Sequence, residues 1–277
     1  MISLVHIDAT TAVLLVLLGF GVGAFGTVVG AGGGFILTPI LLLVYPHDSA
    51  RTLTAISLTA VFFNAASGTA AYARQRRTDF RSGVVFALAA LPGSVAGALV
   101  VGVVSRRVFD GLMGGVLGLL AVWLLSGERW LPGPGRRHVA RRLLTDRQGL
   151  LYEYDVPMLR GTAYSFVVGF VSSFLGIGGG VIHVPLLVRA LGFPTHVATA
   201  TSHFVLAVMS GVGALTHAVT GSFAHGHGTH RAAALSVGVV AGAQVGAHLS
   251  LRLRGRAIEL LLAVALLGLA ARLLVAA

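Results

Sequence analysis

The sequence GAGGG at residues 30–34 recurs as GIGGG at residues 176–180, and in each copy a proline stands five residues after the last glycine. Each block interrupts an apolar stretch that would otherwise favour a helix. Glycine destabilises a helix interior by about 1 kcal/mol relative to alanine, so a run of glycines there predicts a break. In a membrane, irregular backbone survives only where protein or a watery cavity satisfies it, so a repeated break indicates a candidate substrate site.

The duplication extends over almost the whole chain. An offset of 146 positions, which aligns the two glycine blocks, also aligns Phe20 with Phe166, and TAIS at residues 54–57 resembles TATS at residues 199–202 after a small shift. Internal similarity over this length indicates two structural repeats. We expect a first transmembrane repeat at residues 1–126, a basic cytoplasmic linker at residues 127–157 and a second transmembrane repeat at residues 158–277.

The composition is that of a membrane protein. Of the 277 residues, 56% are hydrophobic and only 10% are charged, against roughly 25% charged in soluble domains. We therefore predict an all-α polytopic membrane protein with eight long segments, and two short ones at residues 35–45 and 181–191 that suit half-helices or re-entrant segments. The long apolar runs lie at about residues 10–29, 53–73, 83–104, 108–126, 158–175, 197–221, 232–251 and 257–277.

The relative orientation of the two repeats follows from the number of membrane spans in each half. Each half has three or five spans, depending on whether its short segment crosses the membrane, and either odd number predicts inverted repeats. Most arginines between the segments fall on the same side as the linker, for example those at residues 74–81 and 252–256. Arginine-rich loops stay in the cytoplasm. We expect a bacterial inner-membrane protein with a cytoplasmic linker and both termini in the periplasm.

The glycine blocks and their prolines predict an anion site. Proline is tolerated in the first turn of a helix, so new helices are expected to begin near Phe35 and Val181, with Pro39 and Pro185 in their first turns. The first N–H groups of such helices have no intrahelical acceptor and carry the positive end of the helix dipole. Inverted symmetry would bring the two helix starts together near the middle of the bilayer, where they suit an anion.

Acidic residues are absent from the middles of the apolar segments. All nine Asp and Glu residues fall in loops or near segment ends, whereas cation carriers usually need a buried carboxylate. The chain also has no cysteine, which removes thiolate metal sites and persulfide chemistry. These absences favour an anionic or neutral substrate, with no cofactor and no metal.

The candidate substrate-binding residues are the glycine blocks, their prolines and nearby polar side chains. Serine and threonine also bond to the carbonyl four residues back in their own helix, and glycine also allows close helix packing, so each has a purely structural alternative. We prefer the packing role for the pairs Gly93/Gly97 and Gly242/Gly246. The site candidates are Gly32, Gly33, Gly34, Thr38, Pro39, Thr54, Ser57 and Asn64 in the first half, and Gly178, Gly179, Gly180, His183, Pro185, Thr201, Ser202 and His203 in the second.

Histidines occur inside the apolar segments of the second half only. His183 and His203 stand where the first half has Leu37 and Leu58. An intramembrane histidine is a candidate anion donor or proton carrier, although it can equally hydrogen-bond a neighbouring helix. We interpret the loop HGHGTH at residues 225–230 as solvated rather than metal-binding, since it has no carboxylate or cysteine support.

The paired Gly-x-Gly-Gly-Gly blocks, each followed by a proline in a duplicated helical chain, resemble those of the sulfite exporter TauE/SafE family. The resemblance covers both halves. It implies a permease of the bacterial inner membrane that moves sulfur-containing anions such as sulfite or sulfonates. It also places Gly32–Gly34, Pro39, Gly178–Gly180 and Pro185 in the signature region of the family, whereas His183 has no counterpart in that signature.

The function expected is therefore a secondary transporter for a small anion, working by alternating access. Its partners are the substrate and the lipid bilayer, not nucleic acid, and a homo-oligomer is compatible with the sequence. A passive anion channel could use the same elements. An intramembrane hydrolase would need Ser202 or Ser210 as nucleophile and His203 or His217 as base, but the chain lacks a Gly-x-Ser-x-Gly elbow and an intramembrane acid.

Overall fold

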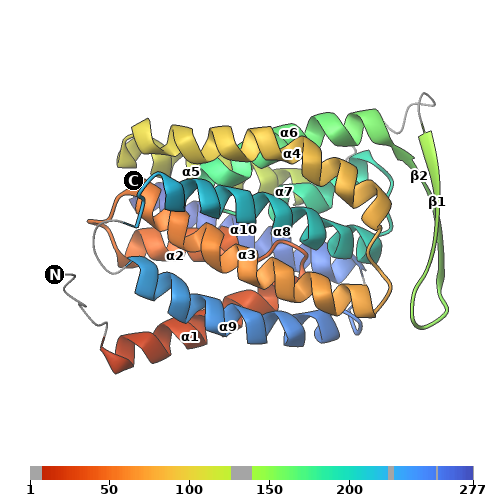
Figure 1. Ribbon diagram of the computed structural model, residues 1–277, viewed down its shortest axis with the longest axis horizontal. Coiled ribbons are helices and arrows are strands. Elements are labelled where there is room, and N and C mark those ends of the chain that lie inside the picture. Colours follow the sequence, from red (N-terminus) through yellow and green to blue (C-terminus); the bar gives the residue numbers. More distant parts are fainter. Residues whose placement is uncertain (1–7, 126–138, 224–227, 254, 277) are drawn as a thin grey trace.

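The computed structural model describes residues 8–125, 139–223, 228–253 and 255–276 (Figure 1). In this part of the chain the protein is a bundle of α-helices with one β-hairpin, which confirms the predicted helical membrane fold, and seven helices are long and apolar enough to cross a membrane. The first half contains α1 (Ala9–Val28), α2 (Gly34–Val44), α3 (Ala50–Arg74), α4 (Phe80–Val100), a 3-10 turn (Val101–Val103) and α5 (Arg106–Leu125). The second half contains α6 (Met158–Leu175), α7 (Gly180–Pro185), a π-helical turn (Leu186–Ala190), α8 (Thr195–Val219), α9 (Gly228–Leu249) and α10 (Gly255–Ala276).

The two halves interlock instead of forming separate bodies. Helix α1 of the first half packs along α9 of the second, and α4 packs along α6 in the same way. A Cβ atom on Gly242 would lie 2.2 Å from the carbonyl oxygen of Phe20, and one on Gly93 would lie 2.2 Å from that of Phe166. Backbones approach this closely only where a side chain is missing. The Gly-x-x-x-Gly pairs therefore serve helix packing, as expected.

The contacts also give the relative directions of the helices. Along α9, Gly238 and Gly242 meet Val16 and Phe20 in the same order, so α1 and α9 are parallel. Along α8, His203 lies against Gly68 and the later Gly213 lies against Leu58, so α3 and α8 are antiparallel. Since α3 and α8 are corresponding helices of the two repeats, their opposite directions support the predicted inversion.

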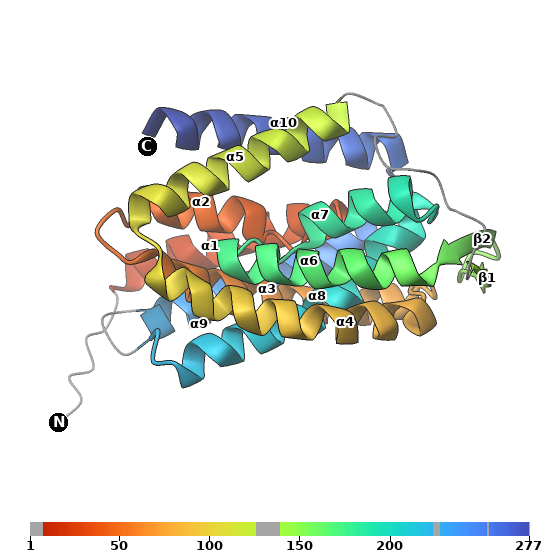
Figure 2. The ribbon, with the colours of Figure 1, turned by 90° about the horizontal axis from the view of Figure 1, so that it is seen from above.

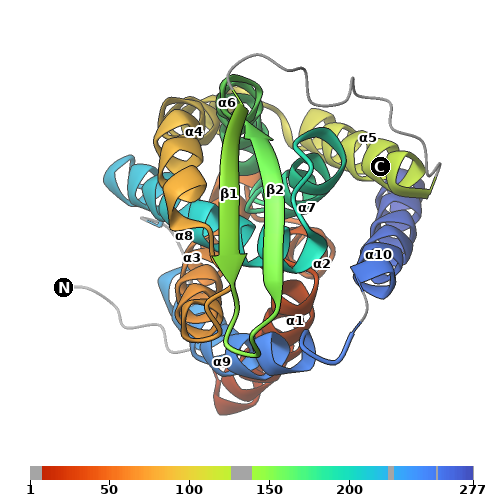
Figure 3. The ribbon, with the colours of Figure 1, turned by 90° about the vertical axis from the view of Figure 1, so that its right-hand side faces the viewer.

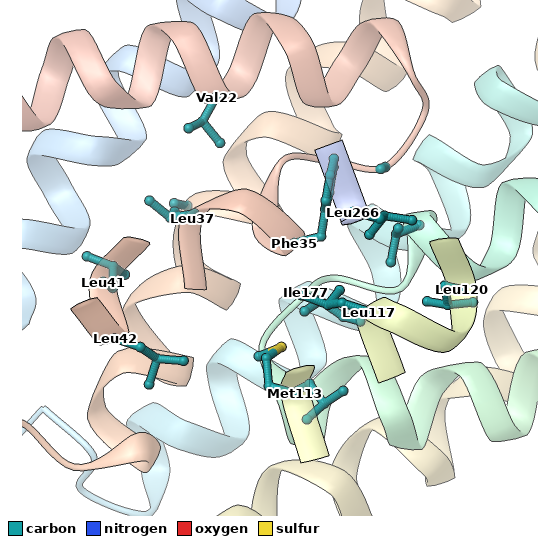
Figure 4. Close-up of a cluster of buried hydrophobic side chains, with 14 of the residues drawn as sticks. Val22, Phe35, Leu37, Leu41, Leu42, Met113, Leu117, Leu120, Ile177 and Leu266 are labelled. Atoms are coloured by element: carbon teal, nitrogen blue, oxygen red, sulfur yellow. The ribbon is translucent and has the colours of Figure 1, made fainter. Parts of the chain in front are cut away.

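The long helices α3 and α8 lie at the centre of the bundle. Buried residues make up 61% of the spanning window of α3 and 67% of that of α8, against 39% for α1 and α5. Helices α5 and α10 run side by side in an outer layer (Figure 2). From there, Met113 and Leu117 of α5 join a buried cluster with Phe35 and Ile177 (Figure 4). The outer layer thus covers the segments that contain the glycine blocks.

The second part of the linker is a β-hairpin, not the plain loop expected. Strand β1 (Val139–Thr145) pairs antiparallel with β2 (Leu151–Pro157), and Gly149 turns the chain between them with a φ of 83°. Residues 127–138 of the predicted linker lie outside the described part. Figure 3 shows the hairpin lying across one end of the bundle, whereas α1 begins and α10 finishes at the opposite end (Figure 1).

Candidate functional site

The glycine blocks adopt a backbone that only glycine takes readily. Gly30, Gly32 and Gly33 have φ values of 79°, 73° and 80°, and the three aligned glycines of the second block, at positions 176, 178 and 179, have 70°, 79° and 74°. Other residues are rarely stable in this left-handed region. The last glycine of each block, Gly34 or Gly180, then begins a helix. The predicted helix starts near Phe35 and Val181 are thus confirmed to within one residue.

The predicted place of the two prolines in these helices is wrong. Pro39 is inside α2, five residues after its first residue Gly34 rather than in the first turn. Pro185 is the last residue of α7 and is followed directly by the π-helical turn. A proline there has no N–H to donate and crowds the carbonyl four residues back, and a local π-turn relieves such crowding. The glycines, not the prolines, therefore fix where the helices begin.

Backbone amides at both helix starts are free of backbone partners. The first bonds of α2 run from the N–H groups of Ile36 and Leu37 to the carbonyl of Gly33, both at 3.0 Å. In the second half, Ile182 and His183 donate in the same way to Gly179, at 3.0 and 2.8 Å. Within the described residues, the N–H groups at positions 34 and 35, and those at positions 180 and 181, make no backbone hydrogen bond. They are the orphan donors expected at a helix N-terminus.

The two blocks also touch each other. A Cβ atom on Gly34 would lie 2.6 Å from the carbonyl oxygen of Ile177, and one on Gly180 would lie 2.5 Å from that of Gly30. The contact is reciprocal, because each helix start rests on the backbone of the other block. The chain therefore brings the two helix starts together, as the sequence predicted.

Three of the candidate hydroxyls converge on the carbonyls of the blocks. Thr38 and Ser57 lie with their hydroxyl oxygens 2.8 Å from the carbonyl oxygen of Gly176, and 2.8 Å from each other. In the other half, Ser202 donates to the carbonyl of Gly30 at 3.3 Å. The hydroxyl of Thr54, also buried, has no hydrogen-bond partner. These side chains support the breaks, and only Thr54 keeps an uncommitted hydroxyl.

Two other candidates have structural partners instead. The side-chain oxygen of Asn64 accepts from Thr27, and its nitrogen donates to the carbonyls of Gly23 and Val239. The hydroxyl of Thr201 accepts from the backbone N–H of Asp79 at 3.0 Å. Both residues tie neighbouring helices together. They are therefore weaker candidates for hydrogen-bonding a substrate than the residues that touch the glycine blocks.

Ser172 is a further candidate for the site that was not among the residues predicted from the sequence. Its hydroxyl is buried without a partner and lies 2.9 Å from the position of a Cβ on Gly179. The 146-residue offset places Gly26 at the equivalent position, and a Cβ there would lie 2.2 Å from the nitrogen of Gly33. The offset alone could have shown this difference. The start of α7 therefore has a hydroxyl group beside it, whereas the equivalent position at the start of α2 is filled by backbone atoms.

His183 and His203 are both fully enclosed and each meets one hydroxyl. The Nε2 atom of His183 is 3.2 Å from Ser165, and that of His203 is 3.3 Å from Thr27. Each hydroxyl already gives its proton elsewhere, Ser165 to the carbonyl of Gly161 and Thr27 to Asn64. The hydroxyls must therefore accept, so Nε2 carries the proton in both histidines. The two Nδ1 atoms have no hydrogen-bond partner.

We expect His183→Leu and His203→Leu to fold normally but to lower transport at least tenfold. The first half already has leucine at both aligned positions, and the hydroxyl that loses the imidazole keeps its own donor bond. A tenfold loss corresponds to about 1.4 kcal/mol in the transition state. Flux into proteoliposomes and elution by gel filtration measure the two properties. Exposed His47, replaced in the same way, serves as the control, and wild-type flux in both variants would show that the histidines only pack.

The chain matches a known family along nearly its whole length. Residues 15–273 fit the sequence profile of the family described as Sulfite exporter TauE/SafE. The chain belongs to this family. The match covers both glycine blocks, so the resemblance read from their residues is confirmed.

Curated relatives of the TauE/SafE chain are named as transporters. It is 29% identical over 261 residues to the probable membrane transporter protein YunE of Bacillus subtilis, covering 92% of this chain and 94% of the relative. It is 27% identical over 202 residues to a probable membrane transporter protein of Methanocaldococcus jannaschii, covering 71% and 68%. A sulfite exporter TauE/SafE family protein of Arabidopsis thaliana is 38% identical over 72 residues, which cover 25% of this chain and 17% of the relative. No solved structure matches the chain.

Proposed function

We propose that this TauE/SafE chain is a secondary transporter for a small anion. The simplest candidates are a sulfur oxyanion such as sulfite, which the description of its family names, and an organosulfonate. The observation that carries the proposal is the meeting of two glycine-block helix starts, each with free backbone amides, among apolar segments that have no aspartate or glutamate in their middles. Helix N-termini favour anions through their amides and dipoles. The uncommitted hydroxyls of Thr54 and Ser172 supply further donors beside the blocks.

Close packing at the blocks supports a carrier over a passive channel. Added Cβ atoms at Gly32 and Gly178 would lie 2.2 and 2.5 Å from Leu206 and Val61, respectively. Side chains of α3 and α8 thus close over the glycines from both halves. An anion could reach the amides only after these helices move, which is the conformational step that alternating access requires.

Hydrolysis is a weaker alternative because the expected nucleophile and base do not meet. Ser202 donates to the carbonyl of Gly30, and Ser210 donates to that of Leu206. The pair Ser165 and His183 is within hydrogen-bond distance, but the serine proton goes to Gly161 and no acid orients the imidazole. A serine nucleophile needs both its base and an orienting group. Within the described residues no cluster of histidines and carboxylates could hold a metal, and the histidine loop at 225–230 lies partly outside them.

The proposed orientation places the hairpin in the cytoplasm of a bacterial cell and both termini in the periplasm. Arg77 and Arg142 lie at the hairpin end, each beside an aspartate. Arg51, Arg106 and Arg231 belong to the other end, where the latter two contact Asp48. Further arginines at residues 74–81, 141–147 and 252 make the hairpin end the richer of the two in arginine, which supports this orientation. Cysteine labelling from either side of the membrane would test it, because the chain has no native cysteine.

We expect purified protein in proteoliposomes to move sulfite or a sulfonate with saturable kinetics. Vesicles without protein give the background, and small carboxylates test whether the anion must carry sulfur. Saturation at modest turnover would indicate a carrier, whereas unitary currents in planar bilayers would indicate a channel. If no anion moves faster than in empty vesicles, the proposed function is wrong.

A further inference from the structure

A second site lies at the hairpin end of the bundle, away from the glycine blocks. A cavity of about 340 Å³ opens between the turn of the hairpin and the ends of α3 and α9. We call it the hairpin socket. The residues that line it and carry polar groups are Gln75, Arg77, Asp146, Arg147, Gln148 and His248.

Arg77 is buried in the socket without adequate partners. Only 4% of its surface is exposed, yet its Nη1 atom has no hydrogen-bond partner. Its Nε atom lies 3.7 Å from the carboxylate of Asp146, too far for a hydrogen bond. One oxygen of that carboxylate already accepts from the amides of Gln148 and Leu150, at 2.9 and 3.0 Å. A buried guanidinium in this state is costly unless a further acceptor binds it.

The other groups of the socket add positive charge and leave an acceptor open. Arg147 lines the cavity from the hairpin turn, and its backbone N–H holds the turn to the carbonyl of Gln75 at 3.0 Å. The socket therefore contains two arginines and one carboxylate. The buried side-chain oxygen of Gln75 has no donor, so water or a protonated ligand oxygen could bond to it. Net positive charge and unused donors are the requirements of an oxyanion site.

We propose that the hairpin socket binds a small tetrahedral oxyanion of the sulfate or phosphate type through Arg77 and Arg147. The volume holds such an ion with several waters, each of which takes about 30 Å³. A bound anion would connect the hairpin turn to the ends of α3 and α9. The site does not depend on the transport proposed above, and its ligand is either a free anion or the phosphate of a lipid headgroup.

Sulfate binding to the full-length protein in neutral detergent tests the proposal. Sodium sulfate is titrated against sodium chloride at constant ionic strength, and binding is followed by calorimetry and by the shift in Tm. We expect saturable binding that Arg147→Gln weakens at least tenfold and Arg77→Gln abolishes, with gel filtration to show that both variants fold. The matched control is Arg141→Gln, on the same hairpin but exposed and paired with Glu153, which should bind as the wild type does.

A variant at the glycine blocks separates the two sites. Gly180→Ala alters the central site only, so we expect it to keep sulfate binding whether or not the chain transports anything. If binding is lost in Gly180→Ala and unchanged in both socket variants, sulfate occupies the central site and the proposal is overturned. Absence of saturable binding to the wild type overturns it as well.

Nanodiscs identify the source of the oxyanion. In discs of phosphatidylcholine alone, sulfate should bind as in detergent. If added phosphatidylglycerol weakens sulfate binding in proportion to its fraction, the lipid phosphate occupies the socket. If it has no effect, the socket takes a free anion. Either result supports an oxyanion at Arg77 and Arg147, whereas binding of sulfate that is equal in wild type and Arg147→Gln in both discs would overturn it.

Discussion

Gly34→Ala and Gly180→Ala are each expected to reduce anion flux by at least a hundredfold. Both glycines are first residues of helices and do not have a positive φ, so alanine suits the local backbone and even favours the helix. The added methyl group instead clashes with the backbone of the other glycine block. A Cβ at position 34 would meet the backbone of Ile177 at 2.6 Å, and one at position 180 would meet that of Gly30 at 2.5 Å.

Backbone atoms on both sides leave the added methyl group little room to relax, so the two blocks must move apart. Overpacking of this kind costs typically 1–3 kcal/mol, which a helical bundle of this size can tolerate. The matched control is Gly21→Ala in α1, where a Cβ would meet nothing within 4 Å. Flux in proteoliposomes and Tm in detergent are measured for all three variants. Wild-type flux in either site variant would refute the role of the paired helix starts.

The sequence was sufficient for features that depend on local chemistry. Apolar runs gave the helices to within a few residues, and the repeated glycines located the starts of α2 and α7. The prediction that Pro39 lies in the first turn of its helix was wrong because the energetic cost of an internal proline can be tolerated. A proline inside a helix is disfavoured but not forbidden, and here the left-handed glycines had already determined the start of the helix.

Features that depend on the partner half were harder to predict. Asn64 looked like a site residue because it is polar and intramembrane, but its bond to the carbonyl of Val239 exists only because α9 of the second half packs against α3. The hairpin was missed although Tyr152, Tyr154 and Val156 alternate with charged residues. That alternation is typical of a strand with one covered face.

Asp79→Ala is expected to lower the free energy of unfolding by about 3 kcal/mol, through two losses. The carboxylate caps α4 by accepting from the backbone N–H of Ser82 at 3.1 Å and from its hydroxyl at 2.7 Å. It also accepts from the phenol of Tyr154 in β2 at 3.0 Å and lies 3.5 Å from Arg142 of β1. The substitution therefore removes a helix cap and leaves a buried phenol without an acceptor.

A double-mutant cycle separates the cap from the hairpin contact. Burial raises the pKa of Tyr154, and the nearby Asp79 carboxylate raises it further, so the phenol stays protonated and donates. Tyr154→Phe should cost about 1 kcal/mol in the wild type and almost nothing in Asp79→Ala, because the bond is already lost. Glu153→Ala, which breaks an exposed pair with Arg141, should leave Tm unchanged. Additive losses from Asp79 and Tyr154 would show that the hairpin is not held at this contact, since groups that share one bond cannot contribute independently.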